Sequence, residues 1–173
     1  VIDVSPLYKY RLTGPDALRL ADRVITRDAT RMKVGQVYYT PWCDEHGKVI
    51  DDGTVHRLSE TEFRWTAADP QLRWLRLNAA GLEIEVEEVT ESLAALALQG
   101  PQSQAVLEAA TGASFADLRY FRRRAAKIGR VALDVEAQGV GEAIVAEDAV
   151  GGRQRPGIDF AGQAGVPAHI ERV

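Results

Sequence analysis

The stretch that most constrains the fold runs from Val37 to Leu58, VYYTPWCDEHGKVIDDGTVHRL. Its first part is rich in β-branched and aromatic side chains, which suit a half-buried pleated surface. Residues 44–47, Asp-Glu-His-Gly, form a polar break in which Gly47 can adopt the positive φ that such turns need. Lys48-Val49-Ile50 then resumes the apolar pattern. The stretch therefore predicts two antiparallel strands folded about a turn, with the rest of the chain arranged around this hairpin.

Two aspartates and a glycine, Asp51-Asp52-Gly53, interrupt the second strand of the hairpin, although these residue types are poor strand formers. One interpretation is a β-bulge or second turn whose carboxylates bond local N–H groups, since Asp-Gly is a common turn signal. The other interpretation is functional. Successive side chains of a strand point to opposite faces, so one aspartate is solvated or bonded to backbone while the other enters a pocket on the buried face. A carboxylate held there among apolar neighbours interacts strongly with an amine placed against it.

Composition limits the classes of partner. A length of 173 residues allows one domain or two small ones that share a core. The net charge of −4 argues against a nucleic-acid surface, which needs a basic excess. The basic cluster of Arg122–Arg124 with Lys127 is expected to be a solvated helix face, with binding of an acidic partner as the alternative. The single cysteine, Cys43, excludes a disulfide within the chain and favours the cytoplasm. No apolar run is long enough to span a bilayer and the first residues do not form a signal peptide, so no membrane association is expected.

The order of the predicted elements favours an α+β fold with mainly antiparallel sheets and flanking helices over a doubly wound parallel one. The strand at 63–67 is expected to pair with 48–58 and to set Trp65 or Phe63 near the acids. Strands are predicted at 1–12, 37–42, 48–58, 63–67, 82–89, 93–98 and 131–135, and helices at 15–26, 70–80 and 102–111, the second with Asp69 as its N-cap and Gly81 as its stop.

The histidines do not predict a metal site. His46, His56 and His169 with Cys43 have no spacing typical of metal ligands. We expect His46 to be a turn residue and His56 to be a strand side chain on the solvent face.

Six segments together resemble the aminomethyltransferase family, which includes the glycine-cleavage T-protein, the folate-dependent demethylases and the folate domains of sarcosine and dimethylglycine dehydrogenases. They occur in the family's order and at close to its spacings over about residues 1–135, and the wording of the hairpin is closer to the demethylase-like branch. The segments are Asp3–Ser5 (DVS), the helix at 15–26, the tyrosine-bearing strand, Gly47–Gly53 (GKVIDDG), Phe63–Trp65 (FRW) and Leu96–Pro101 (LALQGP).

The resemblance implies a tetrahydrofolate pocket at the centre of the fold. Matched residue by residue, Asp52 is the catalytic carboxylate that approaches the folate nitrogen receiving the one-carbon unit. Tyr39 corresponds to a tyrosine lining the same pocket, and Asp51 becomes a supporting residue. Trp65 is a candidate pocket wall, with plain core as the alternative, and Glu142 corresponds to a folate-contacting glutamate.

The resemblance also implies a reaction, in which a methylene or methyl group passes from a small amine, ether or sulfonium donor to tetrahydrofolate without a metal. The carboxylate orients the folate amine and stabilises positive charge near it, or relays a proton. Two alternatives remain open: a non-catalytic folate-binding or regulatory protein of the same fold, and a truncated inactive scaffold whose sheet edges seek a partner.

Family members run to roughly twice this length, so the resemblance implies that the chain is a fragment. Truncation, a misread stretch, and completion of the fold by another chain or domain remain open as explanations of its C-terminal part. We expect a folate-binding-like region at 1–148, incomplete at both ends and open to division into two interwoven subdomains. The match deteriorates after Val135. Residues 149–173 are expected to be a divergent Gly/Ala-rich tail.

Overall fold

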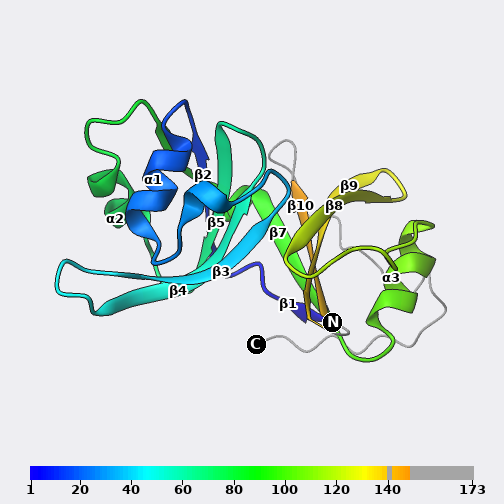
Figure 1. The fold of residues 1–173 in the computed structure, drawn as a ribbon. Coiled ribbons are helices and arrows are strands. Elements are labelled where there is room, and N and C mark those ends of the chain that lie inside the picture. Colours follow the sequence, from blue (N-terminus) through cyan, green and yellow to red (C-terminus); the bar gives the residue numbers. More distant parts are fainter. Residues whose placement is uncertain (140–141, 149–173) are drawn as a thin grey trace. The chain divides into compact units, whose positions relative to one another are not determined.

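The computed structural model describes residues 1–139 and 142–148, whose chain path is shown in Figure 1. The chain is divided into two compact units. The continuous unit comprises Leu7–Thr90, and the split unit combines Val1–Pro6 with the chain from Glu91 onward. Both units contain antiparallel sheets and helices, which confirms the predicted α+β class. The tail predicted at 149–173 lies outside the described residues, so the predicted boundary before it stays a prediction.

The continuous unit is built on a five-stranded antiparallel sheet with the strand order β3-β4-β5-β2-β6. Helices α1 and α2 lie side by side in Figure 1 and contribute apolar side chains to one shared core. The elements are β2 (Tyr8–Thr13), α1 (Ala17–Val24), β3 (Val37–Cys43), β4 (Val49–Arg57), β5 (Glu62–Ala67), α2 (Leu72–Asn78) and β6 (Glu85–Glu88).

Large aromatic side chains dominate this core. Trp42, Trp65, Phe63 and Tyr10 have no exposed surface and pack with Leu20 of α1. The rings of Trp42 and Trp65 meet edge to face with their centroids 5.1 Å apart, a geometry that aromatic pairs favour. Because Trp42 and Trp65 come from β3 and β5, their contact ties both neighbours of β4 to the same core.

The predicted hairpin is confirmed. β3 and β4 pair antiparallel around a turn at residues 44–47, and Gly47 has a φ of 76°. β5 pairs with β4 as predicted. A Cβ atom on Gly53 would lie 1.9 Å from the carbonyl oxygen of Thr66, so only glycine fits at this position. The glycine after the two aspartates therefore permits a close approach between neighbouring strands.

The split unit holds a second five-stranded antiparallel sheet with the order β1-β7-β10-β9-β8. Its core contains Leu98, Leu107, Phe115 and Val135, so it is mainly aliphatic. The elements are β1 (Ile2–Asp3), β7 (Leu93–Gln99), α3 (Ser103–Thr111), β8 (Arg122–Ile128), β9 (Val131–Gly139) and β10 (Glu142–Asp148). Two 3-10 turns, Ala29–Arg31 and Thr90–Ser92, complete the elements.

Several predicted elements were wrong in their bounds. The single strand predicted at 1–12 is two strands in different sheets, because Ile2–Asp3 pairs with β7 and Tyr8–Thr13 pairs with β5 and β6. The second helix begins at Leu72 with Gln71 at the N-cap position, whereas Asp69 was predicted as the N-cap and Pro70 as the first helical residue. The N–H group of Asp69 instead donates to Asp51 Oδ2 at 3.0 Å, outside any helix.

The basic cluster at Arg122–Arg124 is part of strand β8, so its prediction as a solvated helix face was wrong. Acidic partners explain its placement. Arg123 bonds Asp134 of the neighbouring β9 at 2.6 Å, and Arg124 contacts Asp117 at 2.8 Å. Within the described ranges no helix is long and apolar enough to cross a bilayer.

Candidate functional site

Tyr39 of β3 and Asp52 of β4 lie together on one face of the hairpin. In the strand register Tyr39 is opposite Thr54, and Asp52 is opposite Pro41. The Tyr39 hydroxyl donates a hydrogen bond of 2.5 Å to Asp52 Oδ2. The two residues are therefore diagonal cross-strand neighbours in direct contact. Their side chains share one side of the sheet, as the resemblance implied.

This side, which we call the outer face, is opposite to the one that packs on α1. Tyr38 and Trp42 belong to the core shared with α1, and side chains alternate along β3, so Tyr39 points the other way. Asp52 is exposed and Tyr39 is 51% exposed. The prediction that the functional aspartate enters the buried face was therefore wrong: Asp51, opposite Trp42 in the register, is the acid on the core side.

Asp51 bonds backbone at the core side of β4. Its Oδ1 accepts from the N–H of Asp52 at 2.8 Å, and its Oδ2 accepts from the N–H of Asp69 at 3.0 Å. The two interpretations of the Asp-Asp-Gly sequence thus apply to different residues. Asp51 bonds N–H groups, as the structural interpretation expects, and Asp52 is left accessible on the outer face.

The phenol of Tyr39 is an effective donor at neutral pH. The hydrogen bond to Asp52 is the main cause that raises the pKa of Tyr39, and partial desolvation and the charges of Asp52 and Asp51 add to it. The proton therefore stays on the phenol well above neutral pH. Asp52 Oδ1 accepts no hydrogen bond from the residues that the structure describes, so one carboxylate oxygen remains open to a ligand.

The structure does not bring Trp65, one of the residues proposed for the folate pocket, to this pair. Trp65 has no exposed surface and packs on Trp42 in the core, so the structure supports its alternative interpretation as a core residue. Phe63 is likewise fully buried in the core. Glu142 begins β10 in the split unit, and its side chain lies outside the described residues. Its predicted role stays a prediction.

The outer face also carries buried polar residues that the sequence reasoning missed. His56 is opposite Arg64 in the register, and both are buried, so the prediction of His56 on a solvent face was wrong. A hydrogen bond of 3.1 Å joins His56 Nε2 to Thr54 Oγ1, next to Tyr39. The sequence did contain a signal for this placement. Polar residues occupy every second position of β4 and β5 on the face that also carries Tyr39.

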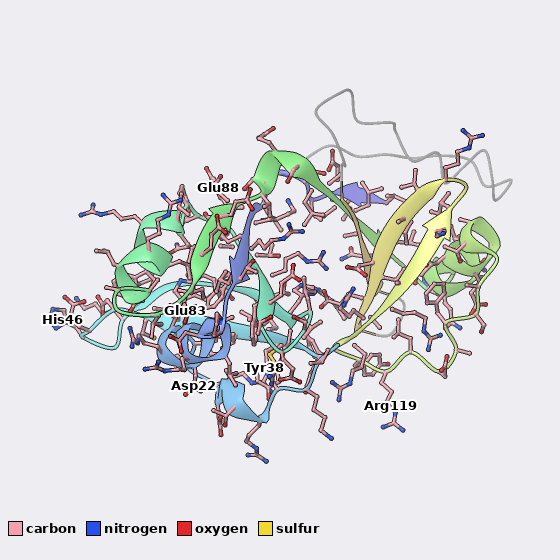
Figure 2. All side chains as sticks on the ribbon, turned by 90° about the horizontal axis from the view of Figure 1, so that it is seen from above. Asp22, Tyr38, His46, Glu83, Glu88 and Arg119 are labelled. Carbon is pink, nitrogen blue, oxygen red and sulfur yellow. The ribbon has the colours of Figure 1, made fainter. Side chains whose placement is uncertain are left out.

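The other histidine of the hairpin behaves as predicted. His46 lies at the tip of the β3–β4 turn, away from the sheet, as Figure 2 shows. No group of three or more His, Cys, Asp or Glu side chains suited to a metal ion occurs among the residues described.

Comparison with known proteins decides the family. The model of the GCVT N-terminal domain family matches residues 1–142. The chain belongs to this family. The resemblance inferred from the six sequence segments is therefore confirmed, and the match includes both Tyr39 and Asp52.

Curated relatives of this GCVT-family chain are enzymes. It is 39% identical over 137 residues to a trimethylamine-oxide aldolase of Ruegeria pomeroyi, covering 75% of this chain and 17% of the relative. It is 35% identical over 126 residues to an aminomethyltransferase of Moorella thermoacetica, covering 70% of this chain and 34% of the relative. The matched part is thus about a third or less of these relatives' length.

Solved structures share the fold. The glycine cleavage system aminomethyltransferase T of Bartonella henselae superposes with a TM-score of 0.78 at 24% identity, over 99% of this chain and 46% of that one. A heterotetrameric sarcosine oxidase of Corynebacterium sp. U-96 superposes with a TM-score of 0.64 at 17% identity, over 85% of this chain and 74% of that one. At these identities the likeness concerns the fold alone.

Proposed function

We propose that this chain provides the tetrahydrofolate-binding part of a folate-dependent one-carbon transferase, of aminomethyltransferase or demethylase type. The observation that carries the proposal is the Tyr39–Asp52 pair, in which Asp52 keeps one carboxylate oxygen open on an accessible face. The pair lies inside the region matched by the GCVT family model. The resemblance to the aminomethyltransferases implies a one-carbon unit carried by folate.

The residues present suit a reduced pterin. A carboxylate acceptor beside an exposed tyrosine ring offers a hydrogen-bonding group and an apolar surface for a flat heterocycle. Tetrahydrofolate, when bound, supplies the nitrogen that accepts the one-carbon unit. Asp52 Oδ1 would accept a proton from this nitrogen or would stabilise positive charge on it. Tyr39 holds the other oxygen of Asp52 and so fixes the plane of the carboxylate.

The donor is proposed to be a small molecule that carries a methyl or methylene group on nitrogen, oxygen or sulfur. Because the curated relatives are about three times as long as the matched part or longer, we propose that residues outside this chain complete the donor pocket. From the family resemblance alone we also propose that Glu142 contacts folate. The single cysteine agrees with activity in the cytoplasm.

Calorimetric titration with tetrahydrofolate tests the proposal directly. We expect binding by the wild-type chain and a dissociation constant raised roughly tenfold by Asp52→Asn, as is typical when a hydrogen bond to a charged group is weakened. One-carbon transfer, assayed in the complete enzyme, should be abolished by the same substitution while part of the folate binding remains.

Glu45→Gln is the matched control, because it removes one negative charge from the exposed tip of the same hairpin. It should leave the affinity for tetrahydrofolate unchanged. Absence of wild-type binding at millimolar tetrahydrofolate would refute the proposal and leave the inactive scaffold as the remaining interpretation. Equal effects of the two substitutions would show that overall charge, and not the Tyr39–Asp52 pair, governs binding.

A further inference from the structure

A series of hydrogen bonds connects the aromatic core of the continuous unit to the backbone of Asp52, and Gln71 is at its centre. Gln71 directly precedes α2 and is only 4% exposed. Its N–H donates to the Tyr10 hydroxyl at 2.7 Å, and its Oε1 accepts from Trp42 Nε1 at 3.4 Å. Its Nε2 donates to Asp51 Oδ2 at 3.4 Å. The other oxygen of Asp51 then accepts from the N–H of Asp52 at 2.8 Å.

The partners of Gln71 require an amide side chain. The indole N–H of Trp42 can only donate, and the ionised carboxylate of Asp51 can only accept. A side chain between them must therefore accept at one end and donate at the other. Glutamine does both without a charge, whereas ionised glutamate has no donor and methionine has no strong donor or acceptor.

We infer that Gln71 is a positioning residue for Asp52. Together with the N–H of Asp69, which donates to the same Oδ2 at 3.0 Å, it fixes the carboxylate of Asp51. Asp51 in turn holds the N–H of Asp52 and so sets the direction in which the Asp52 side chain leaves β4 toward Tyr39. Gln71 bonds to side chains on the core side of the sheet, so it acts through Asp51 and not by touching a ligand on the outer face. The consequence for folate rests on the proposed function; the consequence for Asp52 geometry does not.

Tyr39 reports the position of Asp52 without any ligand. Its pKa is raised chiefly by the hydrogen bond to Asp52, so a displaced Asp52 returns that pKa toward the value of a free tyrosine. The chain has five tyrosines, so their ring Cζ atoms would be labelled with carbon-13 and titrated by NMR, with Tyr39→Phe identifying the Tyr39 signal.

Gln71→Met keeps the shape of the side chain and the net charge but removes the amide. We expect the pKa of Tyr39 to fall in this variant. The control is Gln36→Met, because the Gln36 amide accepts from the N–H of Lys33 and takes no part in the bonds to Asp52. Gln36→Met should leave the Tyr39 titration unchanged. If Gln71→Met does not fold, Gln71→Asn replaces it: the amide remains polar but is one carbon too short to reach both Trp42 and Asp51, so the same fall is expected.

An unchanged Tyr39 titration in a folded Gln71 variant would overturn the inference, because a residue that only fills space leaves Asp52 in place. The second readout is the affinity for tetrahydrofolate, which Gln71→Met should weaken roughly fivefold, the size of one ordinary hydrogen bond, and Gln36→Met should not change. If the wild-type chain binds no tetrahydrofolate, the proposed function fails while the Tyr39 titration still decides the role of Gln71.

Discussion

The two units have sheets of equal strand number but are stabilised differently. The continuous unit closes within Leu7–Thr90 around fully buried aromatic rings, among them Trp42 and Trp65. The split unit needs its first residues to pair with a strand more than ninety positions away, since Ile2 is opposite Ala97, and its core is mainly aliphatic. Closing such a long loop costs chain entropy before any contact forms.

The candidate site lies in the continuous unit, which closes without pairing to a distant part of the chain. Tyr39, Asp52, Asp51 and Gln71 all lie in the continuous unit, together with the rings on which they depend. Damage to the split unit should therefore leave the Tyr39–Asp52 bond intact, whereas damage to the aromatic core should remove it.

The largest expected effect is that of Trp65→Ala. Removing a fully buried indole costs about 3–5 kcal/mol, a large part of the stability of an ordinary domain. Amide hydrogen exchange should show protection lost in the continuous unit first. Leu107→Ala, at a residue only 2% exposed in α3, is the counterpart and should reduce protection in the split unit. Identical exchange patterns for both variants would contradict the comparison.

Gly53→Ala comes next. The new methyl group would meet the carbonyl of Thr66, and the forced separation of β4 from β5 should cost about 2–3 kcal/mol in urea unfolding. Gly47→Ala is the control in the same hairpin: its methyl meets open space, and the positive φ alone should cost about 1 kcal/mol. A larger loss of unfolding free energy for Gly47→Ala than for Gly53→Ala would show that the separation of β4 from β5 does not determine the cost of the Gly53 substitution.

Ser5→Ala tests the split unit. The Ser5 hydroxyl accepts from the N–H of Ala95 at 3.1 Å, so its loss leaves a buried donor unsatisfied and should cost about 1–2 kcal/mol. Protection should decrease in β7 and not in β4. The control, Ser59→Ala, removes a hydroxyl that accepts from the N–H of Thr61 near the surface and should change little. Loss of protection in β4 would disprove the separate dependence of the two units.

Tyr39→Phe should have the smallest effect on stability, about 0.5 kcal/mol, because the bond to Asp52 is exposed and screened by water. Since folding raises the pKa of Tyr39, this contribution is fully present below the unfolded value of about 10 and is lost as pH rises through the folded value. Unfolding of wild type and variant would be compared between pH 8 and 11.

Tyr120→Phe provides the control for that series, because Tyr120 is an exposed tyrosine of the split unit. Its effect should be close to zero at every pH. If the difference in unfolding free energy between wild type and Tyr39→Phe increased with pH, its sign would be opposite to the expected one. The hydrogen bond to Asp52 would then be excluded as the source of the difference.

The elements with strong local signals were predictable. Residue types alone located the hairpin and the turn at Gly47, and the alternation of a strand separated Asp51 from Asp52. Which acid faces the core was not predictable, because that depends on the side of the sheet on which α1 packs. The pairing of Tyr39 with Asp52 came from the family resemblance, since no rule of spacing joins positions in separate strands.

Other wrong predictions have the same cause, namely contacts between residues that are far apart in the sequence. Nothing near Ile2 marks its partner at Ala97, so the first strand was drawn through to residue 12. The run Arg122–Arg124 fits a helix and a strand equally well from the sequence alone. Its acidic partner Asp134, which forms an ion pair with Arg123, lies on the neighbouring strand β9. Gln71 was invisible for a related reason: its three partners come from β2, β3 and β4.

The close approach at Gly53 has a practical consequence for protein engineering. The close contact between Gly53 and Thr66 fixes β4 against β5 at this position, and the faces on which Asp51 and Asp52 lie follow from it. Added residues in the exposed turn at 45–48 would lengthen the tip without rotating either carboxylate, so an affinity tag or fluorophore belongs there. One residue inserted between Asp52 and Gly53 would turn Asp52 over to the helices and bring Asp51 to the outer face in its place.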